Sequence, residues 1–139
     1  MKRHTARKDS FNVAVIGAGA IGLDHIASFQ SHKAASVVAL AETSQERGRQ
    51  AAERFRIPEV TTDYNELLAR DDIDVFSIAL PNHLHAAVAL AALRAGKHVM
   101  LEKPMTTDAR SAARLTRRFG RIAAPARSRS VCIAIRAGA

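Results

Sequence analysis

Three glycines and one glutamate are the residues whose types and spacing most clearly suggest chemistry. Gly17, Gly19 and Gly22 follow directly on the short apolar run 11–16. Glu42 closes a second apolar run and stands 20 residues after Gly22. In a strand–turn–helix unit, such glycines let the backbone approach a diphosphate, and a carboxylate at this distance accepts hydrogen bonds from a ribose. The pattern therefore predicts a dinucleotide-binding site.

Each glycine has a separate expected role in this site. Gly17 is expected to make the tight turn, Gly19 to leave room for the phosphates, and Gly22 to let the helix lie close to the strand. The first helical turn, with Ala20 and Ile21, would point its backbone N–H groups at the anion. The alternative is a glycine-rich turn that only packs an ordinary helix on a sheet.

The residues after Glu42 bear on the choice between NAD and NADP. Ser44 or Arg47 could accept a 2′-phosphate, which would favour NADP. Glu42 argues the other way, because two negative groups at one place repel each other. We therefore expect NAD, with NADP as the alternative, and we expect Arg47 and Arg49 to face solvent.

A second polar stretch, residues 81–85, follows the apolar run 74–80. Parallel sheets bind ligands beyond the carboxyl ends of their strands, so this stretch is a candidate cofactor contact. Asn82 also suits a helix N-cap, which is the alternative role. His83 and His85 are two residues apart and would point in different directions on a helix, so they do not suggest a metal site. We favour His85 as the one that faces the cofactor.

A third polar stretch begins at Glu102, after the strand expected over 97–101. Lys103 could donate a proton to a substrate oxygen, or orient it, beside the nicotinamide, and is the candidate catalytic residue. Glu102 could hold a ribose or position the lysine. The alternative is an exposed ion pair before the turn at Pro104.

The order of the expected elements favours an α/β fold with a parallel sheet. Strands and helical patterns alternate along the chain, as βαβ units require. The expected strands are 11–16, 37–41, 74–80 and 97–101, with a short edge strand over 57–61. The expected helices are 20–32, one capped by Thr43 or Ser44 and ending at Phe55, a small one after Asp63, one ending at Ala95, and one ending near Phe119.

The net charge of +8 belongs to the ends of the chain. Residues 109–139 contain eight arginines and no acidic residue. Because a nucleic-acid-binding domain carries its positive charge on the folded face, we do not expect nucleic acid as a partner. A single cysteine excludes an internal disulfide and fits a cytoplasmic location. No apolar stretch approaches the length of a membrane span, so no membrane partner is expected.

Three strings in the sequence resemble the N-terminal half of the Gfo/Idh/MocA oxidoreductase family. They are Val13–Gly22, Ala79–His85 and, most specific of all, Ala92–Pro104. The resemblance covers about residues 11 to 118. It implies a Rossmann-type doubly wound parallel sheet and an NAD(P)-dependent oxidoreductase that acts on a carbohydrate, polyol or similar hydroxyl-bearing compound.

The resemblance also implies a role for each residue in the matched motifs. The glycines would cradle the diphosphate, and Glu42 would take the place of the usual aspartate on the adenosine ribose. Lys103 matches the family's active-site lysine. The residues that would line the cofactor elsewhere are Pro81, Asn82, His85 and Glu102.

Family members continue into a second, sheet-rich domain that binds substrate and completes the active site with an aspartate and a histidine. Residues 120–139 do not resemble that domain. The expected organisation is a basic flexible arm at 1–10, an NAD(P)-binding domain at 11–119, and an Arg/Ala/Ser-rich tail at 120–139 that is disordered or adds one strand. We expect a frameshift or truncation near Phe119 and no turnover by this chain alone. A non-catalytic dinucleotide-binding regulatory or interaction module is the alternative.

Overall fold

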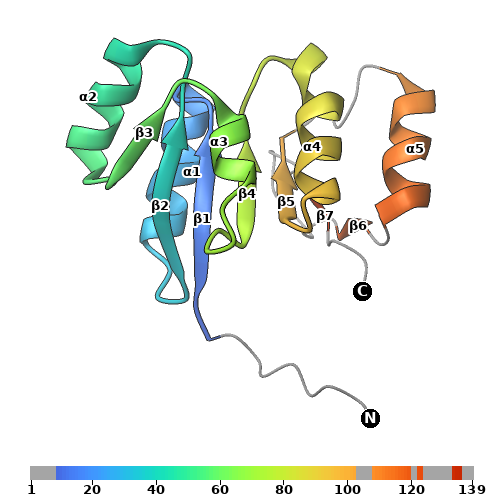
Figure 1. Cartoon of the computed structure of the whole chain (residues 1–139), viewed down its shortest axis with the longest axis horizontal. Helices are drawn as coiled ribbons and strands as arrows, with labels where there is room; N and C mark the ends of the chain where they lie inside the picture. Colours follow the sequence, from blue (N-terminus) through green and yellow to red (C-terminus); the bar gives the residue numbers. More distant parts are fainter. Residues whose placement is uncertain (1–8, 103–107, 120–121, 124–132, 136–139) are drawn as a thin grey trace.

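A twisted β-sheet forms the centre of the computed structural model, which describes residues 9–102, 108–119, 122–123 and 133–135 (Figure 1). The strand order is β3-β2-β1-β4-β5-β7-β6. The strands from β3 to β5 in this order are parallel, and β7 and β6 continue the sheet in antiparallel pairing. Their bounds are β1 (Phe11–Ile16), β2 (Ala35–Ala41), β3 (Glu59–Thr61), β4 (Val75–Ile78), β5 (His98–Leu101), β6 (Ile122–Ala123) and β7 (Ile133–Ile135).

Helices connect the parallel strands and cover both faces of the sheet. One core lies between the sheet and the first two helices, and the other lies between the sheet and the remaining helices. In Figure 1 the parallel strands run upwards, so their carboxyl ends meet at the upper edge. The helices are α1 (Ala20–Gln30), α2 (Gln45–Phe55), α3 (Tyr64–Leu68), the 3₁₀ turn η1 (Asn82–Leu84), α4 (His85–Arg94) and α5 (Ala109–Phe119).

The central strand β1 contributes to both cores because successive side chains of a strand point to opposite faces. Val13 and Val15 belong to the core under α1 and α2, whereas Ala14 and Ile16 belong to the core on the other side. All four side chains are at most 2% exposed. A strand buried on both faces carries a continuous apolar run, as parallel sheets require. The expected doubly wound parallel sheet is confirmed.

Side-chain caps begin two of the helices, and the cap at α2 is Ser44, one of the two residues that the sequence offered for it. The Ser44 side chain accepts the Arg47 N–H at the start of α2, and Asp63 accepts the Asn65 N–H at the start of α3. These side chains satisfy backbone donors that lack an intrahelical partner.

The alternative role considered for Asn82, a helix N-cap, is wrong. Asn82 is the first residue of η1, and Pro81 stands in the cap position with an extended backbone. The Pro81 carbonyl accepts the Leu84 N–H at 3.0 Å, so the chain begins to turn before Asn82 can act as a cap. The regular helix α4 starts only at His85 and has no side-chain cap.

The expected tail at 120–139 contains both antiparallel strands that the structure describes. β7 pairs with the edge of β5, and β6 pairs with β7. The remaining residues of the tail, and residues 1–8 of the expected basic arm, lie outside the described residues.

We expect Gly17→Ala to destabilise the fold and Gly19→Ala to leave its stability nearly unchanged. Gly17 has φ +99°, and a Cβ there would lie 2.4 Å from the Ala79 carbonyl oxygen. Strain and overpacking together should lower the free energy of unfolding by roughly 3 kcal/mol. Gly19 has φ −73° and open space where an added Cβ would lie, so its variant should stay within about 0.5 kcal/mol of wild type. Urea unfolding of the two variants measures the difference, and equal midpoints would contradict the described turn.

Candidate active site

The glycine turn lies where the sheet changes winding direction. From β1 the chain leaves to α1 on one face, and from the neighbouring β4 it leaves to α4 on the other face. Gly17 N–H donates to the Ala41 carbonyl at 2.8 Å, and Ala79 N–H donates to the Ile16 carbonyl at 2.9 Å. These bonds tie together the ends of three strands. Open parallel sheets bind ligands at such a switch point.

The three glycines serve the turn in different ways. A Cβ on Gly22 would lie 2.0 Å from the Gly17 carbonyl oxygen, so Gly22 packs against the turn itself. The structure therefore shows a contact with the turn where the sequence suggested a contact with the strand. Gly19 is exposed and has no atom within 4 Å of an added Cβ. The open face of the turn is at Gly19.

The start of α1 can bind an anion through its backbone. Gly19 is the N-cap and offers no side-chain cap, and the first helical bond runs from Leu23 N–H to the Gly19 carbonyl at 3.0 Å. The N–H groups of Ala20, Ile21 and Gly22 precede that bond and have no carbonyl within the helix to accept them. Both Ala20 and Ile21 are exposed. The helix dipole adds to the attraction for a phosphate.

Glu42 lies beside this turn and is 6% exposed. Its Oε2 accepts the Ala18 N–H at 2.8 Å, so the carboxylate holds the glycine turn directly. Its Oε1 accepts the Ser44 N–H at 3.0 Å, an Arg47 guanidinium N–H at 2.8 Å and, at 3.4 Å, the Thr43 hydroxyl. The acidic residue at the end of β2 is therefore joined to the glycine turn by a single hydrogen bond.

The surroundings of Glu42 keep it ionised. Burial raises the pKa of its carboxyl, but the hydrogen bonds from Arg47, Ser44 and Ala18, together with the charge of Arg47, outweigh burial and lower the pKa from 4.5 to about 2. Glu42 is thus a carboxylate at any physiological pH. An ionised carboxylate accepts hydrogen bonds and donates none, as contact with ribose hydroxyls requires.

Arg47 is the partner of Glu42 that the sequence did not reveal. Its side chain is 57% exposed, as expected, yet it forms an ion pair with the buried carboxylate. Arg49 remains on the exposed face of α2, where it pairs with Glu46 and Glu53. Arg47 stands five residues after Glu42, and Glu42 precedes α2. Because the two residues do not share a helix, helical spacing could not predict their contact.

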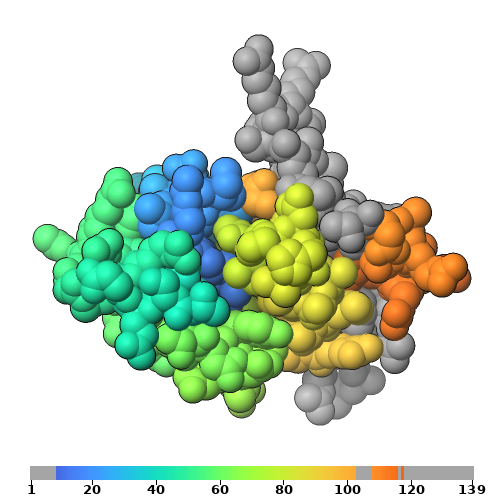
Figure 2. Space-filling view, turned by 90° about the horizontal axis from the view of Figure 1, so that it is seen from above, coloured from blue at the N-terminus to red at the C-terminus, as the bar shows by residue number. Residues whose placement is uncertain are grey.

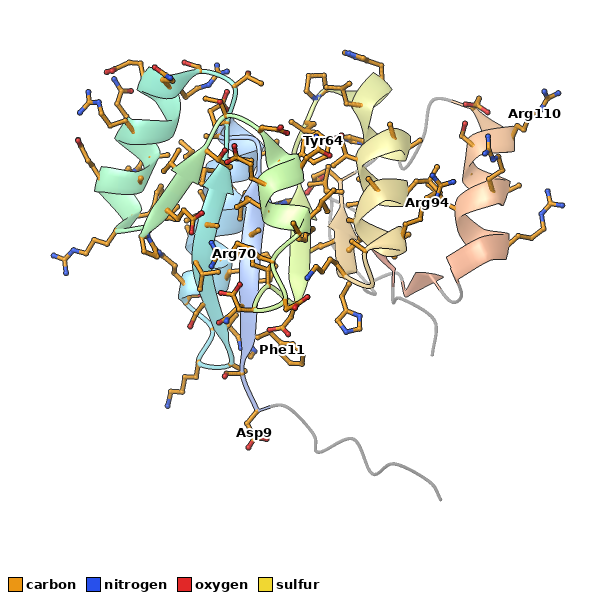
Figure 3. All side chains as sticks on the ribbon, in the orientation of Figure 1. Asp9, Phe11, Tyr64, Arg70, Arg94 and Arg110 are labelled. Carbon is orange, nitrogen blue, oxygen red and sulfur yellow. The ribbon has the colours of Figure 1, made fainter. Side chains whose placement is uncertain are left out.

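A pocket of about 160 Å³ adjoins Glu42 at the same edge of the sheet. Its walls come from the ends of β1 and β2, from α3 and from the segment between β4 and α4. Figure 3 shows Tyr64 near the upper end of the molecule, at the level of this edge. The lining includes Gly17, Glu42, Thr43, Thr62, Tyr64, Leu80 and Leu84. The pocket has the size of one ring system and is mostly apolar.

Figure 2 looks onto the carboxyl edge and shows how its segments gather. The starts of α1 (blue), α2 (teal) and η1 (yellow-green) surround one area. Pro81 and Asn82 are both exposed here. The two residues therefore stand at the edge where the sequence placed them.

His85 is placed differently from the expectation that it faces the cofactor. It is 1% exposed, and its Nε2 donates to the Leu80 carbonyl oxygen at 2.7 Å. The ring closes the turn between β4 and α4 from inside, because α4 begins at this residue and directs it towards the sheet. His85 shapes the segment that carries Asn82, and its ring has no surface to offer a ligand.

Glu102 follows β5 at the same edge, and its N–H reaches the Ile78 carbonyl at 3.4 Å. Its side chain is 13% exposed, and Oε1 lies 2.7 Å from His25 Nε2. The other ring nitrogen of His25 lies 2.7 Å from Ser77 Oγ. Neither His25 nor Ser77 was singled out from the sequence, although a serine inside an apolar strand signals a buried polar partner. The candidate catalytic residue Lys103 lies outside the described residues.

Residues 11–124 match the family described as GFO_IDH_MocA, "Oxidoreductase family, NAD-binding Rossmann fold". The chain belongs to the Gfo/Idh/MocA oxidoreductase family. The resemblance noted in the sequence is confirmed, and so is the prediction of an NAD-type cofactor for this fold.

Relatives within this family extend well beyond the matched region. Inositol 2-dehydrogenase of Corynebacterium glutamicum is 36% identical over 107 residues, which are 76% of this chain and 32% of the relative. A levoglucosan dehydrogenase in complex with NADH has a TM-score of 0.71 and 33% identity, over 75% of this chain and 30% of its own. A 3-ketoreductase from Actinomadura kijaniata, in complex with NADP and TDP-benzene, has a TM-score of 0.71 and 39% identity, over 76% and 32%. The chain spans about a third of the length of these relatives.

No helix in the described part of the chain is long and apolar enough to cross a membrane. Within the same residues, no group of three or more histidine, cysteine or acidic side chains could hold a metal ion.

An apolar groove of about 400 Å³ lies away from the candidate site. It includes Phe11 and Phe29 and begins at the amino end of β1. Figure 3 shows Phe11 at the lower end of the molecule, away from the site.

We expect Glu42→Gln to remove a pH-dependent part of the stability. The folded pKa of about 2 lies below the ordinary value of 4.5, so the carboxylate stabilises the fold above about pH 4.5, and this stabilisation is lost as the pH falls towards 2. Its size is at most about 3 kcal/mol, since Arg47 is partly in solvent and its contribution is screened. Urea unfolding from pH 7 to pH 3 should show the wild type converging on the variant as the pH falls.

The exposed Glu53 on α2 provides the matched control for this experiment. Glu53→Gln should stay within about 0.5 kcal/mol of wild type at every pH. A constant difference between wild type and Glu42→Gln across the pH range would contradict the assignment of the low pKa to Glu42.

Proposed function

We propose that this chain is the NAD-binding part of an oxidoreductase that interconverts a hydroxyl group and a carbonyl group on a sugar or polyol. The observation that carries the proposal is the open, uncapped turn at Gly19 joined by a hydrogen bond to the ionised Glu42. Relatives that act on inositol and levoglucosan, as their names say, support the substrate class. The remaining two thirds of the relatives' length would supply the substrate-binding walls.

The residues present fit a dinucleotide. Its diphosphate would lie on the N–H groups of Ala20 and Ile21, with Gly19 leaving the space it needs. The adenosine ribose would lie against Glu42, with the adenine directed to the neighbouring pocket. Because Oε1 of Glu42 already accepts three donors, ribose hydroxyls would take the place of the long Thr43 contact or of the exposed Arg47.

The same carboxylate favours NAD over NADP. A pKa of about 2 means that Glu42 cannot become neutral to admit a 2′-phosphate at physiological pH. Arg47 reduces the repulsion, since it can turn from Glu42 towards an anion in solvent. We therefore propose a preference for NAD, with weaker binding of NADP.

The chemistry would take place beyond β4 and β5. NAD, when bound, supplies the carbon that accepts a hydride. Lys103 follows Glu102 directly, and we propose that its amine accepts the proton of the substrate hydroxyl. The O–H proton passes to this amine as the C–H hydrogen leaves with its electron pair as a hydride. Asn82 and Pro81 would border the cofactor between its two halves.

The proposed dependence on NAD and the single cysteine, which excludes an internal disulfide, fit a cytoplasmic location.

We expect Gly19→Val to weaken cofactor binding strongly without unfolding the protein. The backbone at Gly19 suits any residue and an added Cβ has no atom of the fold within 4 Å, but the side chain would occupy the space of the diphosphate. NADH fluorescence titration measures the dissociation constant, which should rise at least roughly 100-fold. Ala27→Val, an exposed position near the other end of α1, is the control and should bind like wild type. Unchanged NADH binding by Gly19→Val would overturn the proposed function.

We also expect Glu42→Gln to narrow the preference for NAD. A neutral amide still accepts a hydrogen bond but no longer repels a 2′-phosphate, so the ratio of the NADP and NAD dissociation constants should fall roughly tenfold. Isothermal titration with both cofactors measures the ratio. Glu46→Gln, an exposed acid in the first turn of α2, should leave it unchanged. A ratio that is the same in all three proteins would refute the role of the Glu42 charge.

A further inference from the structure

Three polar side chains from three elements meet inside the fold near the end of β5. His25 comes from α1, Ser77 from β4, and Glu102 from the residue after β5. His25 Nδ1 lies 2.7 Å from Ser77 Oγ, and His25 Nε2 lies 2.7 Å from Glu102 Oε1. His25 is 6% exposed and Ser77 is 0% exposed. Buried polar groups are costly unless they are paired, so these bonds hold the three elements in one arrangement.

The direction of the hydrogen bonds follows from the chemistry of the groups. An ionised Glu102 only accepts, so His25 Nε2 carries the proton in this pair. In the neutral ring, Nδ1 then accepts from the Ser77 hydroxyl; in the charged ring, Nδ1–H donates to it. A hydroxyl can do both, so Ser77 fixes the ring in either protonation state.

The same three residue types occur in hydrolases that use a serine nucleophile, but the burial excludes that role here. A serine nucleophile must reach an acyl group, and it is activated by a histidine that an acid orients. Ser77 is fully buried in the middle of β4, under α1. No acyl group can reach its hydroxyl, so the network acts through its exposed end, Glu102.

The position of Glu102 relates it to the second half of a dinucleotide. Glu42 lies at the end of β2, on one side of the β1–β4 switch point, and Glu102 lies at the end of β5, on the other side. A dinucleotide whose adenosine ribose lies on Glu42 and whose diphosphate lies on α1 extends its other half towards β4 and β5. His25 stands on α1 one turn after Gly22, so one helix serves both the diphosphate and Glu102.

We propose that His25 is a positioning residue that holds the Glu102 carboxylate against the nicotinamide riboside half of the cofactor. This inference rests on the proposed function, since it requires a bound NAD. With the His25 bond in place, the Glu102 carboxylate is presented in one orientation at the edge of the sheet, next to Lys103 in sequence. Without that bond, Oε1 of Glu102 would lose the contact that fixes it relative to α1.

The test compares NADH with ADP, which lacks the nicotinamide riboside, on the full chain. His25→Leu and His25→Asn should weaken NADH binding roughly tenfold and leave ADP binding within about twofold of wild type. His25→Gln, whose amide nitrogen can reach the position of Nε2, should restore NADH binding. Equal losses for NADH and ADP would show a merely structural role and overturn the inference, as would unchanged NADH binding by His25→Leu. If wild type bound neither ligand, the proposed function itself would fail.

A double-mutant cycle and a spectroscopic measurement complete the test. If His25 acts through Glu102, then His25→Leu and Glu102→Ala should each cost roughly tenfold in NADH affinity, and the double variant no more than either alone. Additive losses of about 100-fold would contradict the proposal. If His25→Leu does not fold, long-range ¹H–¹⁵N spectra of the wild type decide: Nε2 should carry a proton that shifts in Glu102→Gln, and an unprotonated Nε2 would overturn the inference.

Discussion

The approach of β1 to β4 at their carboxyl ends is the constraint on which the rest of the structure depends. A Cβ at residue 17 would lie 2.4 Å from the Ala79 carbonyl oxygen, and one at residue 22 would lie 2.0 Å from the Gly17 carbonyl oxygen. Only glycine fits at these two places. Because the turn is so tight, α1 begins beside the strand ends, and its first N–H groups face the edge at which Glu42 and Glu102 also stand.

Two carboxylates at this edge, the buried Glu42 and the partly exposed Glu102, are held in different ways. Glu42 is held by backbone N–H groups and by the exposed Arg47, which keep it charged. Glu102 is held by a histidine that is itself buried and bonded to Ser77. One carboxylate is thus tied to the glycine turn and to the start of α2, and the other to α1 through His25. A ligand that spans both would meet two acceptors whose orientations are set independently.

Local patterns in the sequence were sufficient to predict much of this arrangement. Neighbours within a few residues, or a known spacing, determine the glycines, the position of Glu42 and the Ser44 cap. The partners of His25 stand 52 and 77 residues away in the sequence, so no local pattern indicates them. The inward direction of His85 was also missed, because it depends on where α4 begins after η1. That start follows from the turn at Pro81, whose carbonyl accepts the Leu84 N–H.

The bond between Glu42 and the Ala18 N–H has a consequence for the free energy of ligand binding. It joins the two groups for which we propose adjacent parts of a dinucleotide, the adenosine ribose and the diphosphate, and it exists before any ligand arrives. The conformational entropy of the glycine turn is therefore lost when the protein folds. Ligand binding does not have to order the turn again. In a site that is organised in advance in this way, the exposed side chain of Arg47 is the group that would turn away from Glu42 to admit the ribose.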